Sequence, residues 1–335
     1  MYFKDVIGHK NIIENLITIA KSKNVSHAYI FDGEEGIGKS TVAEIFAQAI
    51  LCQDFCEDNC GHCKSCRLTF NKSHPDVKIY DFTVGEDGKE RASISVESVR
   101  QFKKEIYLKP FFADRKIYIL ENADKMTVEA QNAMLKIFEE PPSYITIILI
   151  TNGISKILST IKSRAVIIKF PSLKSSELEK YLEKNIAETE NKKVYASISG
   201  GSIKRMLELI DDENSLILRR EVIEGIKELI ESSSPVSYNT IYNTFMSNKD
   251  IKDSIIDMFM MFIMDIVHTK FENEDKIINI DMTDELKKIA LKVNVISINK
   301  IENYLFDLKK KIEGNANYKL TVLASLLNIW EELHG

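Results

Sequence analysis

Two hydrophobic patterns divide the chain near residue 170. Before it, short runs rich in Ile, Val and Tyr alternate with segments whose apolar residues recur every three or four positions. The runs predict buried strands, and the recurring spacing predicts amphipathic helices. The predicted strands lie at residues 27–31, 77–80, 117–120, 145–150 and 166–168. Because strands that alternate with helices form a parallel sheet covered on both faces, we expect an α/β domain over residues 1–170.

The rest of the chain shows helical spacing only. Three short helices are predicted first, with a Gly200-Gly201 break between the last two, at residues 175–186, 192–199 and 202–210. They suggest a small helical lid domain over residues 171–211. Longer amphipathic segments follow at residues 216–230, 251–267, 286–293, 301–312 and 320–330. They predict an all-helical third domain over residues 212–335, so the expected fold class is α/β plus all-α.

The overall charge limits the kinds of partner. The chain has 45 basic and 50 acidic side chains, a formal charge of −5, and so lacks the basicity of a domain that binds nucleic acid alone. Any DNA contact should be local or shared with other subunits. The longest apolar run, Met258–Met264, is far shorter than the ~20 residues that span a bilayer. The amino terminus also lacks a secretory signal pattern, so we expect a cytoplasmic protein without a membrane segment.

A phosphate-binding motif follows the first predicted strand. Its residues are Gly33-Glu34-Glu35-Gly36-Ile37-Gly38-Lys39-Ser40, and they fit the pattern G-x-x-x-x-G-K-[ST] before an amphipathic helix. In this motif the glycines let backbone N–H groups surround a phosphate. Lys39 would reach the β and γ phosphates, and Ser40 would offer its hydroxyl to Mg²⁺. The motif predicts a site for ATP and Mg²⁺ and leaves hydrolysis open.

The predicted strand at residues 117–120 ends in Glu121-Asn122. A complete site of this kind usually has a carboxylate for Mg²⁺ at such a strand end, followed by a second carboxylate that activates water. Glu121 can serve the metal, but Asn122 cannot act as a base. Loss of a positioned base typically costs roughly 10²–10⁴-fold in rate, so we expect weak hydrolysis or none. Without the phosphate loop, the pair would be interpreted as an ordinary polar strand end.

Four of the five cysteines are clustered. Seven, two and two residues separate Cys52, Cys60, Cys63 and Cys66. Two linked C-x-x-C steps in a cytosolic protein favour tetrahedral zinc, and four thiolates leave no open position for catalysis. We therefore predict one structural zinc ion per chain, with buried reduced thiols or redox chemistry as the alternatives. Cys56 and His62 lie in the same stretch and leave the choice of ligands open.

Further motifs occur in order along the chain. They are Val6-Ile7-Gly8-His9, Ser26-His27-Ala28-Tyr29, Asn122-Ala123-Asp124-Lys125-Met126, Leu135-Lys136-Ile137-Phe138-Glu139-Glu140-Pro141-Pro142 and Ser163-Arg164-Ala165. With the phosphate loop and the cysteine insertion, they resemble the bacterial clamp-loader family of AAA+ proteins over nearly the whole chain. The length and the altered strand end look most like the delta-prime subunits of DNA polymerase III. The resemblance implies a RecA-like domain with a zinc module, a helical lid and a helical collar that joins five subunits into an open ring.

The resemblance also implies roles for single residues. Asn152 lies at the sensor-1 position, and Lys204 aligns with the lid arginine that would contact the γ-phosphate, with Arg205 one place on. Arg164 matches the arginine of the Ser-Arg-Cys motif, which reaches into the ATP site of a neighbouring subunit, although Ala165 replaces the cysteine. Such rings load the sliding clamp onto primed DNA. The implied partners are therefore the motor (gamma/tau) and delta subunits, the clamp and primed DNA.

Three functions are compatible with the sequence. The favoured one is a ring subunit that activates a neighbour and hydrolyses little or no ATP itself. The intact loop at residues 33–40 also allows an ATP-hydrolysing motor subunit of the same ring. A small-molecule kinase is the third, but the cysteine insertion, Asn152 and the helical tail do not suit it. Lysines at residues 103–104 and 309–311 could touch DNA phosphates, although such runs are usually solvated helix faces.

Overall fold

The computed structural model describes residues 2–83, 92–186, 191–212, 214–234, 236–314 and 316–335. Internal contacts divide the chain into two compact units. The first unit comprises the described residues of 1–187 and 200–205, and the second unit those of 188–199 and 206–335. The expected lid at residues 171–211 contributes to both units, and its residues 187–190 lie outside the described residues. The division into three domains stays a prediction.

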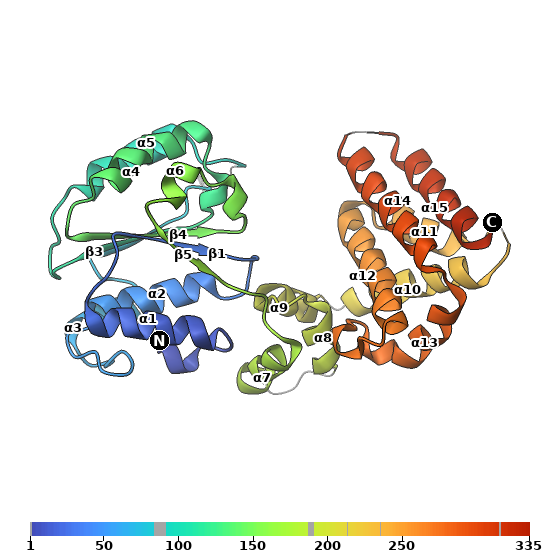
Figure 1. Ribbon diagram of the computed structural model, residues 1–335, viewed down its shortest axis with the longest axis horizontal. Coiled ribbons are helices and arrows are strands. Elements are labelled where there is room, and N and C mark those ends of the chain that lie inside the picture. The colour runs from blue at the N-terminus through green and yellow to red at the C-terminus, as the bar shows by residue number, and fades with distance from the viewer. Residues whose placement is uncertain (1, 84–91, 187–190, 213, 235, 315) are drawn as a thin grey trace. The chain divides into compact units, whose positions relative to one another are not determined.

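The first unit contains a five-stranded parallel sheet (Figure 1). Its strand order is β2-β3-β4-β1-β5, so β1 lies between β4 and β5. The strands are β1 (Ala28–Asp32), β2 (Val77–Tyr80), β3 (Lys116–Leu120), β4 (Ile145–Thr151) and β5 (Val166–Lys169). All five predicted strands are confirmed to within one residue at each end. Sequence reasoning succeeds here because the central strands are buried on both faces and therefore consist of nearly unbroken apolar runs.

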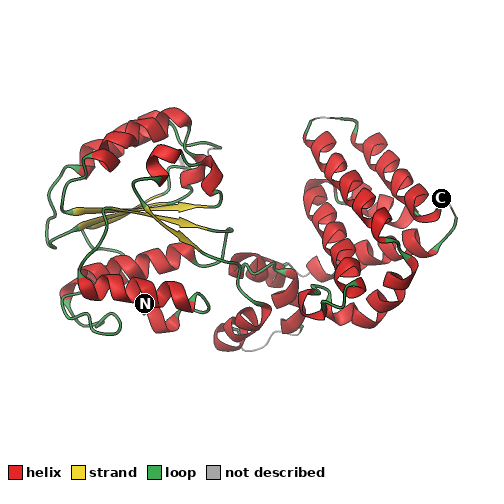
Figure 2. Cartoon of the chain, in the orientation of Figure 1, coloured by secondary structure: helices red, strands yellow, loops and turns green. Residues whose placement is uncertain are grey.

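Helices cover both faces of this sheet (Figure 2). One face carries α1 (Lys10–Ser22), α2 (Lys39–Leu51) and α3 (Lys64–Phe70); the other carries α4 (Val96–Ile106), α5 (Val128–Glu139) and α6 (Ser159–Lys162). Successive strand residues point to opposite faces, so Tyr29 packs in the core under α2 while Ile30 packs in the core under α5. The predicted α/β sandwich is therefore confirmed. Helix α7 (Ser175–Asn185) also belongs to the first unit.

A buried carboxylate fixes the loop that precedes β3. Asp76 is fully buried, and its oxygens accept hydrogen bonds from the backbone N–H groups of Phe111 at 2.6 Å and of Phe112 and Ala113, both at 2.8 Å. Burial alone would raise the pKa of Asp76, but the three N–H donors outweigh it and lower the pKa below its usual value. The ionised carboxylate thus stabilises this loop.

Replacing Asp76 with asparagine should lower the free energy of unfolding by about 1–3 kcal/mol at pH 7, because the amide cannot accept all three bonds. A carboxyl whose folded pKa is depressed stabilises the protein above its unfolded pKa, and this stabilisation is lost as the pH falls through the folded pKa. The difference between wild type and Asp76→Asn should therefore shrink below about pH 4. Denaturant unfolding at neutral and acidic pH measures it, and an unchanged difference would contradict the prediction.

The described residues of the second unit form helices and connecting loops and contain no strand. Its helices are α8 (Lys192–Ile198), α10 (Ser215–Glu231), α11 (Asn239–Ser247), α12 (Lys252–Lys270), α13 (Thr283–Lys292), α14 (Val295–Glu313) and α15 (Tyr318–His334). Helix α9 (Ile203–Asp211) begins in the first unit and ends in the second. The core is formed by fully buried side chains such as Phe245, Phe259 and Phe262. Among the described residues, no helix combines the length and apolar character that crossing a membrane requires.

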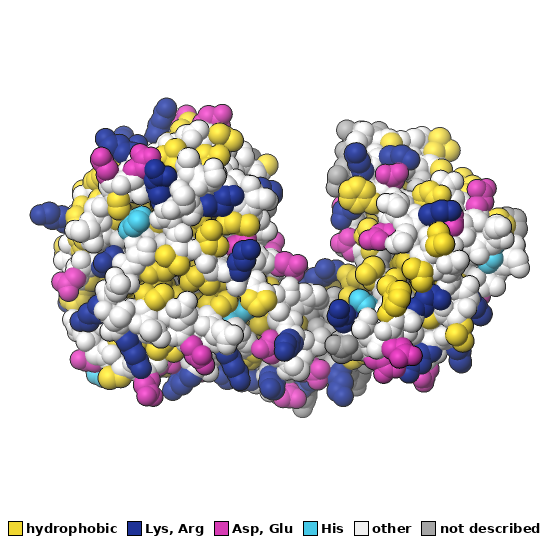
Figure 3. Space-filling view, in the orientation of Figure 1, with side chains coloured by type: hydrophobic (Ala, Val, Ile, Leu, Met, Phe, Trp, Pro, Cys, Tyr) yellow, Lys and Arg dark blue, Asp and Glu magenta, His cyan; other side chains and the backbone are white. Residues whose placement is uncertain are grey.

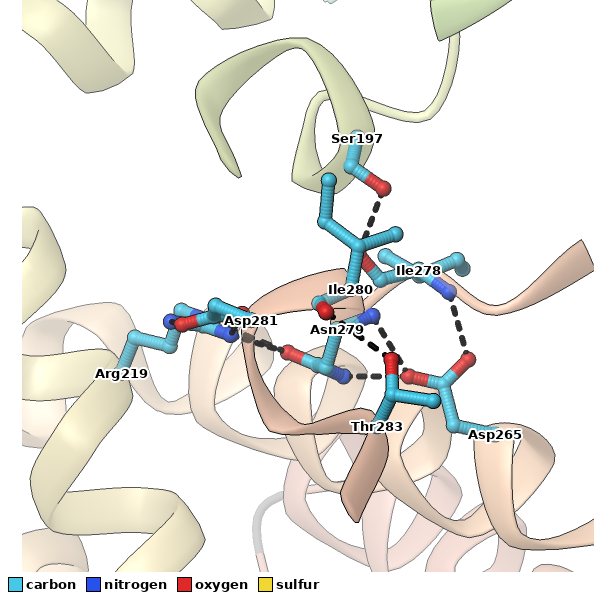
Figure 4. Close-up of polar contacts among 8 residues, drawn as sticks. All are labelled: Ser197, Arg219, Asp265, Ile278, Asn279, Ile280, Asp281 and Thr283. Atoms are coloured by element: carbon cyan, nitrogen blue, oxygen red, sulfur yellow. Dashed lines mark hydrogen bonds and ion pairs between the residues drawn. The ribbon is translucent and has the colours of Figure 1, made fainter. Parts of the chain in front are cut away.

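A buried polar network fixes an irregular segment of the second unit, residues 277–281 (Figure 4). Asp265 on α12 is fully buried and accepts hydrogen bonds from Ile278 N at 2.7 Å and from the backbone and side chain of Asn279 at 2.8 and 2.6 Å. Asn279 Oδ1 in turn accepts from Arg219 Nε on α10 at 3.0 Å. Ser197 Oγ on α8 donates to Ile278 O at 2.5 Å. The network therefore joins this segment to three helices.

Candidate nucleotide and metal sites

The phosphate loop connects β1 to α2, and its glycines are required by its geometry. Gly36 and Gly38 have φ angles of +78° and +100°, in the left-handed region that favours glycine. A Cβ atom on Gly36 would also lie 2.5 Å from Lys204 Cβ, and one on Gly33 would lie 2.5 Å from Phe170 O. The loop therefore has its shape because three positions carry no side chain.

The start of α2 is open to an anion. Among the described residues, the backbone N–H groups of residues 38–41 have no hydrogen-bond acceptor. Such N–H groups carry the positive end of the helix dipole, and phosphate groups bind there by accepting their hydrogen bonds. The predicted phosphate loop thus has a geometry that can hold phosphate.

The side chain of Lys39 lies inside the loop. It is 4% exposed, and its Nζ donates to Gly33 O at 2.7 Å, to Asn152 Oδ1 at 2.9 Å and to Glu34 O. Burial lowers the pKa of Lys39, and the carboxylate of Glu121 opposes that shift. The predicted residues Lys39 and Asn152 are therefore brought together.

Two candidate Mg²⁺ ligands, Ser40 and Glu121, also meet beside the phosphate loop, at the carboxyl ends of the strands. Ser40 Oγ, in the first turn of α2, donates to Glu121 Oε2, just after β3, at 3.0 Å. Burial raises the pKa of Glu121, and the hydrogen bond from Ser40 opposes the shift. Hydroxyl and carboxylate oxygens are ligands that Mg²⁺ accepts, so these residues fit the ion. Asn122 offers no base here, since its Nδ2 donates to Asp81 Oδ2 at 3.2 Å.

Lys204 reaches the phosphate loop but pairs with one of its side chains. Lys204 Nζ lies 2.5 Å from Glu35 Oε1, and this ion pair lowers the pKa of Glu35. Ser202 Oγ donates to Glu35 O at 2.9 Å, and Ile203 N donates to Gly36 O at 2.9 Å. The first residues of α9 are thus hydrogen-bonded to the loop. Lys204 Nζ is therefore already engaged by the Glu35 carboxylate in this structure.

Sequence reasoning missed the group that orients Asn152. Asp124 is 9% exposed, and its Oδ1 accepts a hydrogen bond from Asn152 N at 3.0 Å, while its Oδ2 lies 3.6 Å from Lys156 Nζ. This carboxylate fixes the turn that follows β4 and so the direction of the Asn152 side chain. The available signal was its place in the motif at residues 122–126.

Arg164 lies at the amino ends of the strands, whereas the phosphate loop lies at their carboxyl ends. Arg164 precedes β5 by two residues, and the register aligns Val166 with Tyr29 near the start of β1. Gly33 follows the end of β1. At about 3.3 Å per residue, Arg164 and the phosphate loop are separated by roughly 20 Å along the strands. Arg164 therefore cannot reach the phosphate site of its own chain.

The four clustered cysteines have the geometry of a metal site. The Sγ atoms of Cys52, Cys60, Cys63 and Cys66 all lie within 4.8 Å of one another. The distance from Cys60 Sγ to Cys66 Sγ is 3.8 Å, which matches the edge of a tetrahedron with Zn–S bonds of about 2.3 Å. Backbone N–H groups also point at sulfur, for instance Cys63 N at 3.3 Å from Cys60 Sγ. These four residues can therefore hold a metal ion.

The pKa values of the thiols differ within the cluster. Burial raises the pKa values of Cys52 and Cys66. Burial also acts to raise the pKa of Cys60, but hydrogen bonds from the backbone of Cys63 and His62 outweigh it and lower the pKa to about 6. Cys56 is exposed and is not part of this group of sulfur atoms. His62 forms a second, exposed group with Asp54 and Cys60.

Comparison with known proteins agrees with these features. Residues 8–174 match the family described as DNA polymerase III, delta subunit, and residues 213–332 match DNA polymerase III, delta subunit, C terminal. The chain is 25% identical to DNA polymerase III subunit delta' of Bacillus subtilis over 91% of each chain. It is 27% identical to subunit delta' of Pseudomonas aeruginosa, over 92% of this chain and 93% of that one. Subunit tau of Bacillus subtilis is 30% identical, over 78% of this chain and 49% of that one. Together, these matches and the AAA+ fold show that the chain belongs to the clamp-loader subunit family of bacterial DNA polymerase III.

Proposed function

We propose that this chain is a delta-prime subunit of the clamp loader of DNA polymerase III. It assists the ATP-dependent loading of the sliding clamp onto primed DNA during replication. Its own contribution to the chemistry is Arg164, which enters the ATP site of a neighbouring motor subunit. Its partners are motor (gamma/tau) and delta subunits, and it hydrolyses little or no ATP itself.

The position of Arg164 carries this proposal. Because Arg164 is roughly 20 Å from its own phosphate loop along the strands, it can act on a phosphate only when the phosphate belongs to another subunit. An arginine delivered in trans neutralises charge that develops on the γ-phosphate during hydrolysis. The side chain is 37% exposed, so a neighbouring subunit can reach it.

The chain's own site favours binding over hydrolysis. The open N–H groups at the start of α2, Lys39 and the Ser40–Glu121 pair fit ATP and Mg²⁺. If bound, Mg²⁺ would be held by Ser40 and Glu121 and would offset phosphate charge. Asn122 cannot take a proton from water, and its amide is engaged by Asp81. Nucleotide would therefore have a structural role here.

A motor subunit is the second candidate. Its support is the complete loop from Gly33 to Ser40, together with the 30% identity to a tau subunit. A motor would depend on Lys39 for turnover, whereas a delta-prime subunit would not. This difference separates the two candidates.

Replacing Lys39 with alanine should change ATP turnover by the reconstituted complex less than about twofold. The substitution removes the cation of this chain's phosphate loop, but in a delta-prime subunit ATP is hydrolysed by the motor subunits and not by this chain. Steady-state turnover with clamp and primed DNA measures the effect, and wild-type chain alone should show almost no turnover. If Lys39→Ala abolishes turnover, or if the isolated chain hydrolyses ATP strongly with DNA, the motor function is correct instead.

We also propose zinc as the ion held by the four cysteines. Four thiolates in tetrahedral geometry suit Zn²⁺ and leave no position for a substrate, so the ion would be structural. It would link the end of α2, where Cys52 lies, to Cys63 and Cys66 at the start of α3.

DNA contact is proposed only through the assembled ring. Basic and acidic side chains are interspersed on the visible face of each unit (Figure 3). Two lysines of the predicted clusters have partners in this chain: Lys103 Nζ donates to Ala133 O at 3.2 Å, and Lys309 Nζ lies 3.2 Å from Asp257 Oδ1. These contacts favour solvated helix faces over a dedicated DNA site.

A further inference from the structure

Arg164 is held in one orientation by three acceptors. Its Nη1 donates to Thr160 O at 2.9 Å and to Ser163 Oγ at 3.3 Å, and its Nη2 donates to Glu139 Oε1 at 3.2 Å. Thr160 and Ser163 lie on or next to α6, immediately before Arg164, but Glu139 comes from the end of α5. Glu139 is therefore the only one of these three acceptors that is charged and distant in sequence.

The place of Glu139 in α5 is unfavourable for the helix itself. It is the last residue of α5, and negative charge at a helix carboxyl end is repelled by the helix dipole. Its side chain is 49% exposed, so it contributes little to the core. The ion pair with Arg164 gives this carboxylate a role that helix stability does not explain.

Exposed arginine side chains have many rotamers, and fixing one of them costs entropy. If a carboxylate already holds the guanidinium in place, less rotamer entropy is lost when a neighbouring subunit binds. Thr160 O and Ser163 Oγ accept from Nη1 of the guanidinium, while Glu139 accepts from Nη2. Together they determine both where the group lies and how it is turned.

We propose that Glu139 is a positioning residue for Arg164. Its carboxylate orients the guanidinium at the surface of the first unit, ready for the phosphate of a neighbouring subunit. The inference rests on the proposed function, since positioning has an effect only if Arg164 acts in trans. Glu139 itself touches no substrate in this scheme.

A double-mutant cycle in the reconstituted complex with clamp and primed DNA tests this inference. We expect Glu139→Ala to lower the single-turnover rate of ATP hydrolysis at the neighbouring site roughly 10- to 100-fold, as misplacement of an oriented group does, and to leave ATP binding at that site unchanged. Glu139→Gln keeps an oxygen acceptor and should restore part of the rate. In an Arg164→Ala background, Glu139→Ala should have no further effect, because the group it orients is gone.

Glu140→Ala is the matched control. Glu140 is the next residue, carries the same charge and is exposed, but is not among the three acceptors of Arg164. It should leave turnover unchanged. If Arg164→Ala slows turnover while Glu139→Ala leaves or raises it, the positioning role is wrong and the proposed function stands. Equal losses from Glu139→Ala with and without Arg164 also overturn it. If Arg164→Ala itself has no effect, both the proposed function and the inference fall.

Discussion

Replacing Arg164 with alanine should slow ATP hydrolysis at the neighbouring subunit's site by roughly 10³-fold or more, the range found for arginines supplied in trans. The physical reason is the loss of a planar cation that stabilises charge on the transferring phosphate. Binding of ATP should change far less, since this charge develops mainly in the transition state. Single-turnover measurements on the reconstituted complex isolate the affected site, whereas steady-state rates average over all sites in the ring.

Two control variants sharpen this prediction. Arg164→Lys keeps the charge but not the fork of donors, and should recover only a small part of the rate. Arg100→Ala removes an exposed arginine of α4 whose Nη1 lies 3.9 Å from Glu97, and should leave hydrolysis unchanged. A complex that keeps its full rate with Arg164→Ala would contradict the trans role of this chain.

The second large effect that we expect is a loss of stability when the proposed zinc ion is removed. We expect purified protein to carry close to one zinc ion per chain, and Cys66→Ser to lose the ion and about 4 kcal/mol or more of stability. Cys66 is fully buried, so its loss leaves three thiols and no closed site. Metal analysis and thermal unfolding measure the two effects. Chelation at neutral pH should produce the same destabilisation in wild type.

Cys56→Ser is the matched control for the zinc prediction. Cys56 is the exposed cysteine outside the group of four sulfur atoms, so its variant should keep both the ion and the melting temperature. A zinc content near zero in protein purified without added metal would overturn the zinc proposal. Equal losses from Cys56→Ser and Cys66→Ser would show that the ligand set is wrong.

The three central strands of the sheet, β3, β4 and β1, could be predicted from the sequence because they are buried on both faces and therefore form apolar runs. The edge strands β2 and β5 are partly exposed, but they are also rich in Val and Ile, which favour strands. Five α-helices of the described residues were not predicted, namely α1, α3, α4, α6 and α11. Helix α11 has only nine residues, and its buried apolar side chains are Ile241 and Phe245, so its pattern is too short to be distinctive. The strand order was also beyond reach, because it depends on contacts between segments far apart in the chain.

In the candidate sites, too, continuous motifs could be predicted from the sequence, whereas contacts between distant residues could not. The phosphate loop and the cysteines are continuous motifs, and their chemistry follows from residue type and spacing. The ion pair between Lys204 and Glu35 joins residues 169 positions apart, and the one between Arg164 and Glu139 joins residues 25 apart. Neither pair could be predicted without the fold. Each pair changes the interpretation of one motif residue: Lys204 is paired with Glu35 of the phosphate loop, and Arg164 is paired with Glu139.

The division of the chain into units has a consequence for how the protein is made. The chain passes from one unit to the other after residues 187, 199 and 205. During synthesis from the amino terminus, the ribosome must release residues 188–199 before the segment that completes the first unit emerges. Until Ile203 is available, Gly36 O lacks its N–H donor. A fragment cut at residue 187 would therefore lack the hydrogen bonds that residues 202–204 make to Glu35 and Gly36, whereas one that extends through residue 211 would include them.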